Sequence, residues 1–277
     1  MDIALAARAD EAEARASADF FRAAPPALAS RLGLRVEHHA GATVLLAAHL
    51  PAATFNRVIG AGVHQRAQPQ DLDHWLARLA AAGAQPGWVH LAPGAQPAEL
   101  ADWLAQRGLT PAARRAWVKL WRGTAAAPSV ASSLHIAPTT PETLAATAQA
   151  IVAAFEMPPA VAEWIGALHG RSRWTLYSVL DGQQPVGGGA LYLDDGSAWL
   201  GMAGVLASHR NRGGQGALMA RRIADALAAG SHSQYTETGE PVGQESNPSL
   251  TNMLRCGFSP VMSRLNLRIP PPEGRSS

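Results

Sequence analysis

Residues 203–222, AGVLASHRNRGGQGALMARR, bring together residue types that bind phosphate. Arg210 and Arg212 offer positive charge and paired donors, and three glycines follow them at positions 213, 214 and 216. Without a Cβ, these glycines would let phosphate oxygens approach the main chain. A helix-like run comes next, with unpaired first-turn N–H groups and a positive dipole end. The stretch predicts a site for a phosphate-bearing small molecule; a flexible turn with solvated arginines is the alternative.

Other ligand motifs do not fit the chain. A P-loop needs Gly-Lys followed by Ser or Thr, and no such triplet occurs. A dinucleotide fingerprint needs Gly-x-Gly-x-x-Gly in a βαβ unit, whereas GGQG has another spacing and follows hairpin-like strands. The ten histidines show no HxxxH or HExxH pair, and Cys256 is the single cysteine. We therefore expect no metal site.

Composition narrows the choice of partners. The net charge is +2, and the arginines are scattered except around 207–222, which is too little basic surface for a nucleic-acid footprint. No apolar run approaches the ~20 residues that span a bilayer, and the acidic N-terminus lacks the pattern of a signal peptide. The single cysteine suits a reducing compartment. We expect a cytoplasmic protein with no nucleic-acid or membrane partner.

The elements that would position the glycine-rich loop follow a clear order in the second half of the chain. TPETLAATAQAIVAAF (140–155) predicts a helix, 174–206 three strands joined by hairpin turns, and 217–230 an amphipathic helix. A strand at 233–239, a helix at 247–258 and a strand at 261–269 complete the series.

The first half repeats part of this order. Strands are predicted at 42–50, 55–63, 87–93 and 114–121, and helices at 71–83 and 98–109. LADWLAQRGLTP (100–111) and LTNMLRCGFSP (250–260) end alike, with a helix, Gly, an apolar residue, Ser or Thr, and Pro. Where the second copy has HRNRGGQGA, the first has HQRAQPQ, with no glycine and with Pro69. We interpret this as a degenerate internal duplication.

The predicted fold class is α/β, with two domains that each have a mostly antiparallel mixed sheet flanked by helices. The first domain is predicted over 1–123 and the second over 134–269. The small-residue stretch 124–133 is predicted as a linker and 270–277 as a disordered tail.

The second half resembles the GNAT (GCN5-related) N-acetyltransferases. VLASHRNRGGQGALMARRI is similar to their motif A, Val-x-x-x-x-Arg-x-x-Gly-x-Gly/Ala-x-x-Leu, which binds the pyrophosphate of acetyl-CoA. Val205, Arg210, Gly213 and Leu218 match, and Gln215 stands where Gly or Ala is usual. The resemblance covers about 134–269 and implies acetyl-CoA as co-substrate. It implies a cofactor-binding set of Ala203, Val205, Arg210, Asn211, Arg212, Gly213, Gly214, Gln215, Gly216, Ala217 and Asn252.

The resemblance also implies direct transfer without a covalent intermediate. A deprotonated amine attacks the thioester, and in many relatives a Tyr four residues before the Gly of the last helix protonates the thiolate. Met253 occupies that position here. Water or Cys256 could take its place, although a buried apolar role is the simpler reading of Cys256. Glu237 is the predicted catalytic base, with Glu156 as another candidate and a solvated loop carboxylate as the alternative for each.

The predicted function is acetyl transfer to an unidentified small amine by a monomer or homodimer. A non-catalytic acyl-CoA sensor is the alternative that the missing Tyr favours, and a scaffold without cofactor is a third. We expect the first half to bind no cofactor. Because the loop would lie at the surface, the sequence also predicts that Gly213→Val abolishes binding while the fold survives.

Overall fold

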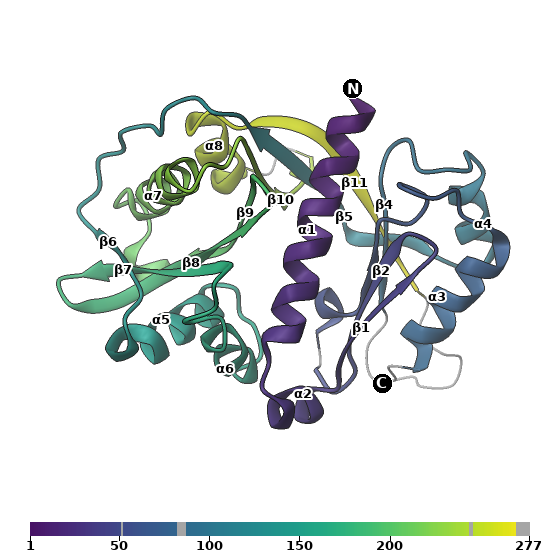
Figure 1. The fold of residues 1–277 in the computed structure, drawn as a ribbon, viewed down its shortest axis with the longest axis horizontal. Coiled ribbons are helices and arrows are strands. Elements are labelled where there is room, and N and C mark those ends of the chain that lie inside the picture. The colour runs from purple at the N-terminus through teal and green to yellow at the C-terminus, as the bar shows by residue number, and fades with distance from the viewer. Residues whose placement is uncertain (51, 82–86, 244–245, 270–277) are drawn as a thin grey trace. The chain divides into compact units, whose positions relative to one another are not determined.

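The computed structural model describes residues 1–50, 52–81, 87–243 and 246–269, and the predicted tail at 270–277 lies outside them. The chain forms two compact units (Figure 1). Unit 1 comprises Met1–Lys119, Thr238–Glu245 and Pro260–Ser277, and unit 2 comprises Leu120–Glu237 and Ser246–Ser259. These units differ from the predicted halves at the end of the chain, because the last strand pairs within unit 1.

Unit 1 is a mixed sheet between helices. Its strand order is β1 (Leu34–His39), β2 (Ala42–Ala47), β3 (Arg57–Ile59), β4 (Trp88–Leu91), β11 (Ser259–Arg268) and β5 (Thr110–Arg122). Only β3 and β4 are parallel among the pairs whose register is known in the described residues. Figure 1 shows α1 (Ile3–Ala23) on one face and α3 (Pro69–Ala81) and α4 (Leu100–Gln106) on the other; α2 (Pro26–Leu32) follows α1.

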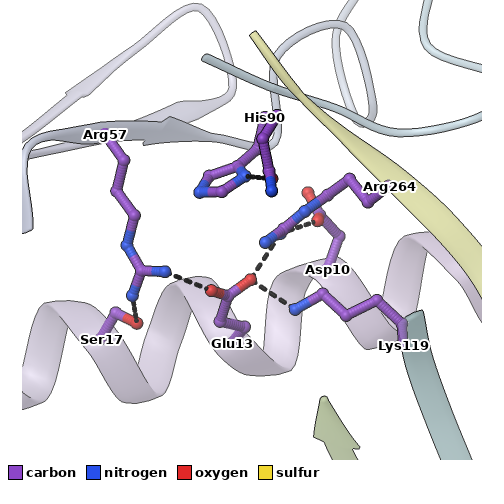
Figure 2. A network of polar contacts seen from close by, with 8 residues as sticks. Asp10, Glu13, Ser17, Arg57, His90, Lys119 and Arg264 are labelled. Carbon is purple, nitrogen blue, oxygen red and sulfur yellow. Dashed lines mark hydrogen bonds and ion pairs between the residues drawn. The ribbon is translucent and has the colours of Figure 1, made fainter. Parts of the chain in front are cut away.

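A buried charge network fastens α1 to the sheet of unit 1 (Figure 2). The Glu13 carboxylate accepts from Arg57 at 2.8 Å and from Lys119 and Arg264 at 2.5 Å each. Arg264 also donates to Asp10 at 2.5 Å. These partners lie on β3, β5 and β11, so one helix side chain connects three strands. Removing one member would leave buried charge without its partner, which costs several kcal/mol.

His90 lies in the same network and stays neutral. Its Nδ1 donates to Asn266 Oδ1 at 2.8 Å, and its Nε2 is buried without a hydrogen-bond partner. Burial, with the positive charge of Arg264 next in importance, holds the pKa of His90 well below its usual value. The cations also hold the pKa of Glu13 well below its usual value, against the opposing effect of burial.

Unit 2 is a second mixed sheet with helices on both faces. Its strand order is β10 (Ser233–Gly239), β9 (Ser197–Val205), β8 (Gln184–Asp194), β7 (Trp174–Asp181) and β6 (His135–Pro138), with β9–β10 parallel and the other pairs antiparallel. α5 (Pro141–Ala154) and α6 (Ala160–Gly166) cover one face, and α7 (Gly214–Ala228) and α8 (Pro248–Arg255) the other (Figure 1). The structure confirms the predicted fold class.

Local sequence explains the helix that matters most for the site. Leu218, Met219, Ile223 and Ala226 are buried at the spacing of one helix face and pack α7 on the sheet. The helix begins at Gly214, three residues before the predicted start, so the glycines form its first turn. The predicted linker 124–133 contains no helix or strand. No helix among the described residues is long and apolar enough to cross a membrane.

Candidate cofactor and active site

The candidate site begins where two parallel strands stop pairing. The β9–β10 register runs from Ser197 opposite Ser233 to Trp199 opposite Tyr235. The Thr236 hydroxyl then donates to the Leu200 carbonyl at 2.8 Å. Beyond this point β9 continues to Val205 and β10 to Gly239 outside that register. The β9–β10 register therefore ends before either strand does.

The chain leaves β9 through a short 3-10 helix, Ala207–His209, and enters α7 through a left-handed turn. Asn211 has φ 62° and Gly213 has φ 78°. The first intrahelical bond joins the Ala217 N–H to the Gly213 carbonyl at 3.0 Å. The N–H groups of Gly214, Gln215 and Gly216 precede it, and the first turn carries no acidic residue. An anion is favoured at such a helix terminus.

The three glycines also allow another segment of the chain to pack closely against the loop, which was not predicted from the sequence. A Cβ on Gly213 would lie 2.2 Å from the Ala131 carbonyl oxygen, and one on Gly214 would lie 2.8 Å from Leu134 Cδ1. A Cβ on Gly216 would lie 3.0 Å from Val130. The segment 130–134 is thus pressed against the loop. The loop lies at the surface, with Arg210 and Asn211 exposed, but a side chain on Gly213 would meet the backbone of this segment, so the expected survival of the fold in Gly213→Val is revised.

The two arginines of the loop have different environments. The Arg212 guanidinium donates to both oxygens of Asp181, at 2.6 and 3.0 Å, and to the Ser133 hydroxyl at 3.0 Å. Hydrogen bonding from Arg212 lowers the pKa of Asp181. Arg210 is exposed at the end of the 3-10 helix. Arg212 therefore holds the loop against β7, and Arg210 is the arginine with its side chain in solvent.

The remaining predicted site residues lie on β9, α7, α8 and β10 and after α5. Ala203 is half-buried and Val205 buried on β9, and Gln215 is half-buried in the first turn of α7. Asn252 is half-buried on α8, a helix that contacts α7. Glu237 is half-buried on β10, two residues beyond the last paired residue. Glu156 is exposed shortly after α5 and has φ 54°. Helix α5 itself lies on the opposite face of the sheet from α7 (Figure 1).

The residue at the position of the usual Tyr, the single cysteine and the three tyrosines are all enclosed. Met253 is buried at 5% exposure and Cys256 at 3%. Burial raises the pKa of the Cys256 thiol, so it stays protonated and covered. The Tyr177 hydroxyl donates to Asp225 at 2.7 Å, and burial raises its pKa. Tyr192 and Tyr235 are also buried, at 3% each.

One residue that sequence reasoning missed is Arg222. It is fully buried within the apolar face of α7, where its guanidinium donates to the carbonyls of Ala190 and Gly201 at 3.0 and 3.1 Å. The signal was present in the sequence, since position 222 falls on the same helix stripe as Leu218. Met202, with φ 54° beside Gly201, was missed as well.

Comparison with solved structures assigns the fold. A GCN5-related N-acetyltransferase from Kribbella flavida superposes with TM-score 0.65 at 19% identity, covering 96% of each chain. One from Sphaerobacter thermophilus gives TM-score 0.59 at 16% identity, covering 85% of this chain and 82% of its own. A tandem GNAT protein from the clavulanic acid biosynthesis pathway gives 0.59 at 16% identity, covering 91% and 86%. No family model and no curated protein matches.

These identities establish the fold and not the activity. The chain has the fold of the GCN5-related N-acetyltransferases, and its coverage of a tandem member extends through both units. The predicted resemblance to the fold of this family is confirmed.

Proposed function

We propose that this chain is an acetyl-CoA-dependent N-acetyltransferase that acts on a small amine. The observation that carries the proposal is the entry into α7. A left-handed Gly213 opens a helix whose first turn has no acidic residue, directly after the strand that parts from β10. This arrangement offers neutral and cationic donors to a diphosphate, and the part of β9 beyond its register with β10 would lie along the rest of an extended ligand.

The residues present fit the cofactor. The N–H groups of Gly214, Gln215 and Gly216 and the side chain of Arg210 would hold the pyrophosphate, with Asn211 and Ala217 at the margins of the turn. The backbone of Ala203 and Val205 would pair with the extended arm, and Asn252 would contact it from α8. Arg212, bonded to Asp181, would keep the loop in shape. Bound acetyl-CoA would supply an activated acyl group.

We propose Glu237 as the base that removes a proton from the acceptor amine. It lies on β10 just past the end of the ladder, near the same opening between the strands. Water would supply the proton for the leaving thiolate, because Met253 offers no acidic hydrogen and Cys256 is covered. A small acceptor is consistent with the low charge of the chain, and a monomer or homodimer in a reducing compartment remains our proposal.

The enclosed Met253 and Cys256 favour a second candidate, a sensor that binds an acyl-CoA without turnover. A scaffold that binds no cofactor is disfavoured by the intact first turn of α7.

Two measurements separate these functions. Thermal shift with acetyl-CoA tests binding, and release of free CoA thiol in the presence of an amine panel tests turnover. An N-acetyltransferase should show a raised melting temperature and thiol release with at least one amine. Stabilisation without thiol release across the panel would favour the sensor. A melting temperature unchanged by millimolar acetyl-CoA would overturn both.

A further inference from the structure

Two glycines of β9 have their side-chain positions occupied by aromatic rings. A Cβ on Gly201 would lie 1.8 Å from Trp199 Cη2, so the indole lies against the main chain of its own strand. A Cβ on Gly204 would lie 2.8 Å from Ala154 Cβ and 3.1 Å from Phe155 Cε2, both at the end of α5. Because glycine has no side chain, each ring can contact the strand backbone directly.

The two rings lie on one face of the sheet, the face that α5 covers. Gly188 is the register partner of Gly204, and a Cβ on it would lie 2.6 Å from a threonine methyl of α5. Ala190, two residues further along β8, is on the same face, and its register partner is Gly201. Trp199 precedes Gly201 by two residues and therefore shares this face with it.

The proposed base lies on the same face. Tyr235 of β10 is the parallel register partner of Trp199, and the register between the two strands ends at this pair. Glu237 follows Tyr235 by two residues, so strand alternation places it on the face of Tyr235 and Trp199. The carboxylate that would deprotonate an amine is thus on the side of the sheet where the two rings lie.

The two rings differ from ordinary core residues. Phe155 is the C-cap of α5 and is 50% exposed, and Glu156 turns the chain away with φ 54°. Exposed phenyl surface forgoes part of the free energy that burial would supply. Trp199 is 8% exposed, and its Nε1 is buried without a hydrogen-bond partner, which is uncommon for a polar group. An exposed ring and an unpaired donor on one face indicate a surface that a ligand completes.

We propose that Phe155 and Trp199 select an arylalkylamine as the acetyl acceptor, with its aromatic group against the two rings and its amine toward Glu237. Aromatic rings in offset or edge-to-face contact stabilise a complex beyond the area that they bury. A small aliphatic amine or a polyamine would leave both rings uncovered. The inference rests on the proposed function and names the class of its acceptor.

The test compares amines on the same protein sample. Release of free CoA thiol at saturating acetyl-CoA gives kcat/KM for 2-phenylethylamine, ethylamine and 1,4-diaminobutane. The readout is the ratio of kcat/KM between two amines, because this ratio does not depend on the fraction of protein that is folded. Wild-type protein is compared with Phe155→Ala, Phe155→Leu, Trp199→Leu and Leu254→Ala. Leu254 is the matched control, since it is an apolar residue, 46% exposed, on α8.

Wild-type protein should prefer 2-phenylethylamine over ethylamine by roughly tenfold or more. Phe155→Ala and Trp199→Leu should each lose most of this preference, Phe155→Leu should lose part of it, and Leu254→Ala should keep it. If Trp199→Leu does not fold, the two Phe155 variants decide by the same criterion.

A wild-type ratio in Phe155→Ala would overturn this inference alone, as would a wild-type preference for ethylamine or 1,4-diaminobutane. Absence of thiol release with every amine would overturn the proposed function and this inference together.

Discussion

The two units of this chain share a strand–helix–strand arrangement but differ in the residues at the N-terminus of its helix. In unit 2, β9 leads into α7 and then into parallel β10; in unit 1, β3 leads into α3 and then into parallel β4. The first turn of α7 has no acidic residue. The first turn of α3 begins with Pro69, which lacks an N–H, and contains Asp71. That carboxylate accepts from the Gln68 N–H at 2.8 Å and bonds His39 at 3.0 Å.

The backbone hydrogen bonds of the loops that follow the parallel strands also differ between the two units. In unit 1 the Gln96 N–H donates to the Gly62 carbonyl at 2.7 Å, and the Ala67 N–H donates to the Gln96 carbonyl at 2.9 Å. Backbone that follows β4 is thereby joined to backbone that follows β3. In unit 2 the Leu206 N–H donates to Val186 on β8 at 2.9 Å. In unit 1 the backbone after β3 is thus bonded to the backbone after β4, whereas the described backbone bond after β9 goes to β8.

This comparison supports the proposal that only unit 2 binds cofactor. Because a shared topology does not decide function, the helix-terminal residues and the loop bonding are the features to test. The following changes test the comparison, from the largest expected effect to the smallest.

Gly213→Val should damage both the fold and the site. The new Cβ would meet the Ala131 carbonyl oxygen at 2.2 Å, and valine resists φ 78°. Overpacking and backbone strain together cost about 2–6 kcal/mol. Chemical denaturation should report this loss of stability. Wild-type stability would show that segment 130–134 moves away easily, contrary to the packing described for the loop.

Arg210→Ala should weaken acetyl-CoA binding while leaving stability unchanged. A charge-assisted hydrogen bond contributes about 1.5–3 kcal/mol, which corresponds to roughly ten- to a hundredfold in affinity. Arg212→Ala is the matched control, because its guanidinium is bonded to Asp181 and Ser133. Arg212→Ala should lower the melting temperature, and it should weaken acetyl-CoA binding less than Arg210→Ala does. Calorimetry giving equal affinity losses for both would contradict the division of roles between the two arginines.

Gln215→Asp should give the first turn of α7 an acidic residue, as Asp71 does in α3. A carboxylate near a helix N-terminus stabilises the helix by about 0.3–1 kcal/mol. The same charge repels a pyrophosphate, and we expect roughly tenfold weaker acetyl-CoA binding, or about 1.4 kcal/mol. Stability and affinity therefore move in opposite directions, with Gln215→Asn as the neutral control. Tighter acetyl-CoA binding by Gln215→Asp would contradict the interpretation of this turn as an anion site.

The stability of unit 1 should depend on the titration of His90. Its folded pKa is well below 6.5, so below pH 6.5 the unfolded chain binds a proton that the folded chain does not. Stability should fall as pH drops from about 6.5 toward 5, by at most about 1.4 kcal/mol per pH unit. The stabilising effect of Glu13, whose folded pKa is lowered, is lost only at more acidic pH. His90→Asn keeps a donor toward Asn266 and should make stability less dependent on pH in this range. His169→Asn, at an exposed position, is the control and should leave the pH dependence unchanged.

Local chemistry made much of this fold predictable. Apolar spacing located α5 and α7, and turn residues separated β7, β8 and β9, because these elements depend on neighbours in sequence. The glycine-rich loop was predicted at the N-terminus of α7 for the same reason. Strand β3 is shorter than the strand predicted at 55–63, and α7 begins earlier than predicted, since strand pairing and the packing of segment 130–134 set those limits.

The sequence by itself determined the class of elements, the duplicated order and the position of the candidate anion site, because helix termini, glycine turns and apolar stripes are short-range properties. The tertiary structure decided that Arg212 bonds Asp181, that Gly213 faces Ala131, and that Arg222 lies beneath a bulge in β9. It also decided that β11 completes unit 1. Each of these joins residues far apart in the chain, and only the pairing of strands and the packing of helices on them brings such residues into contact.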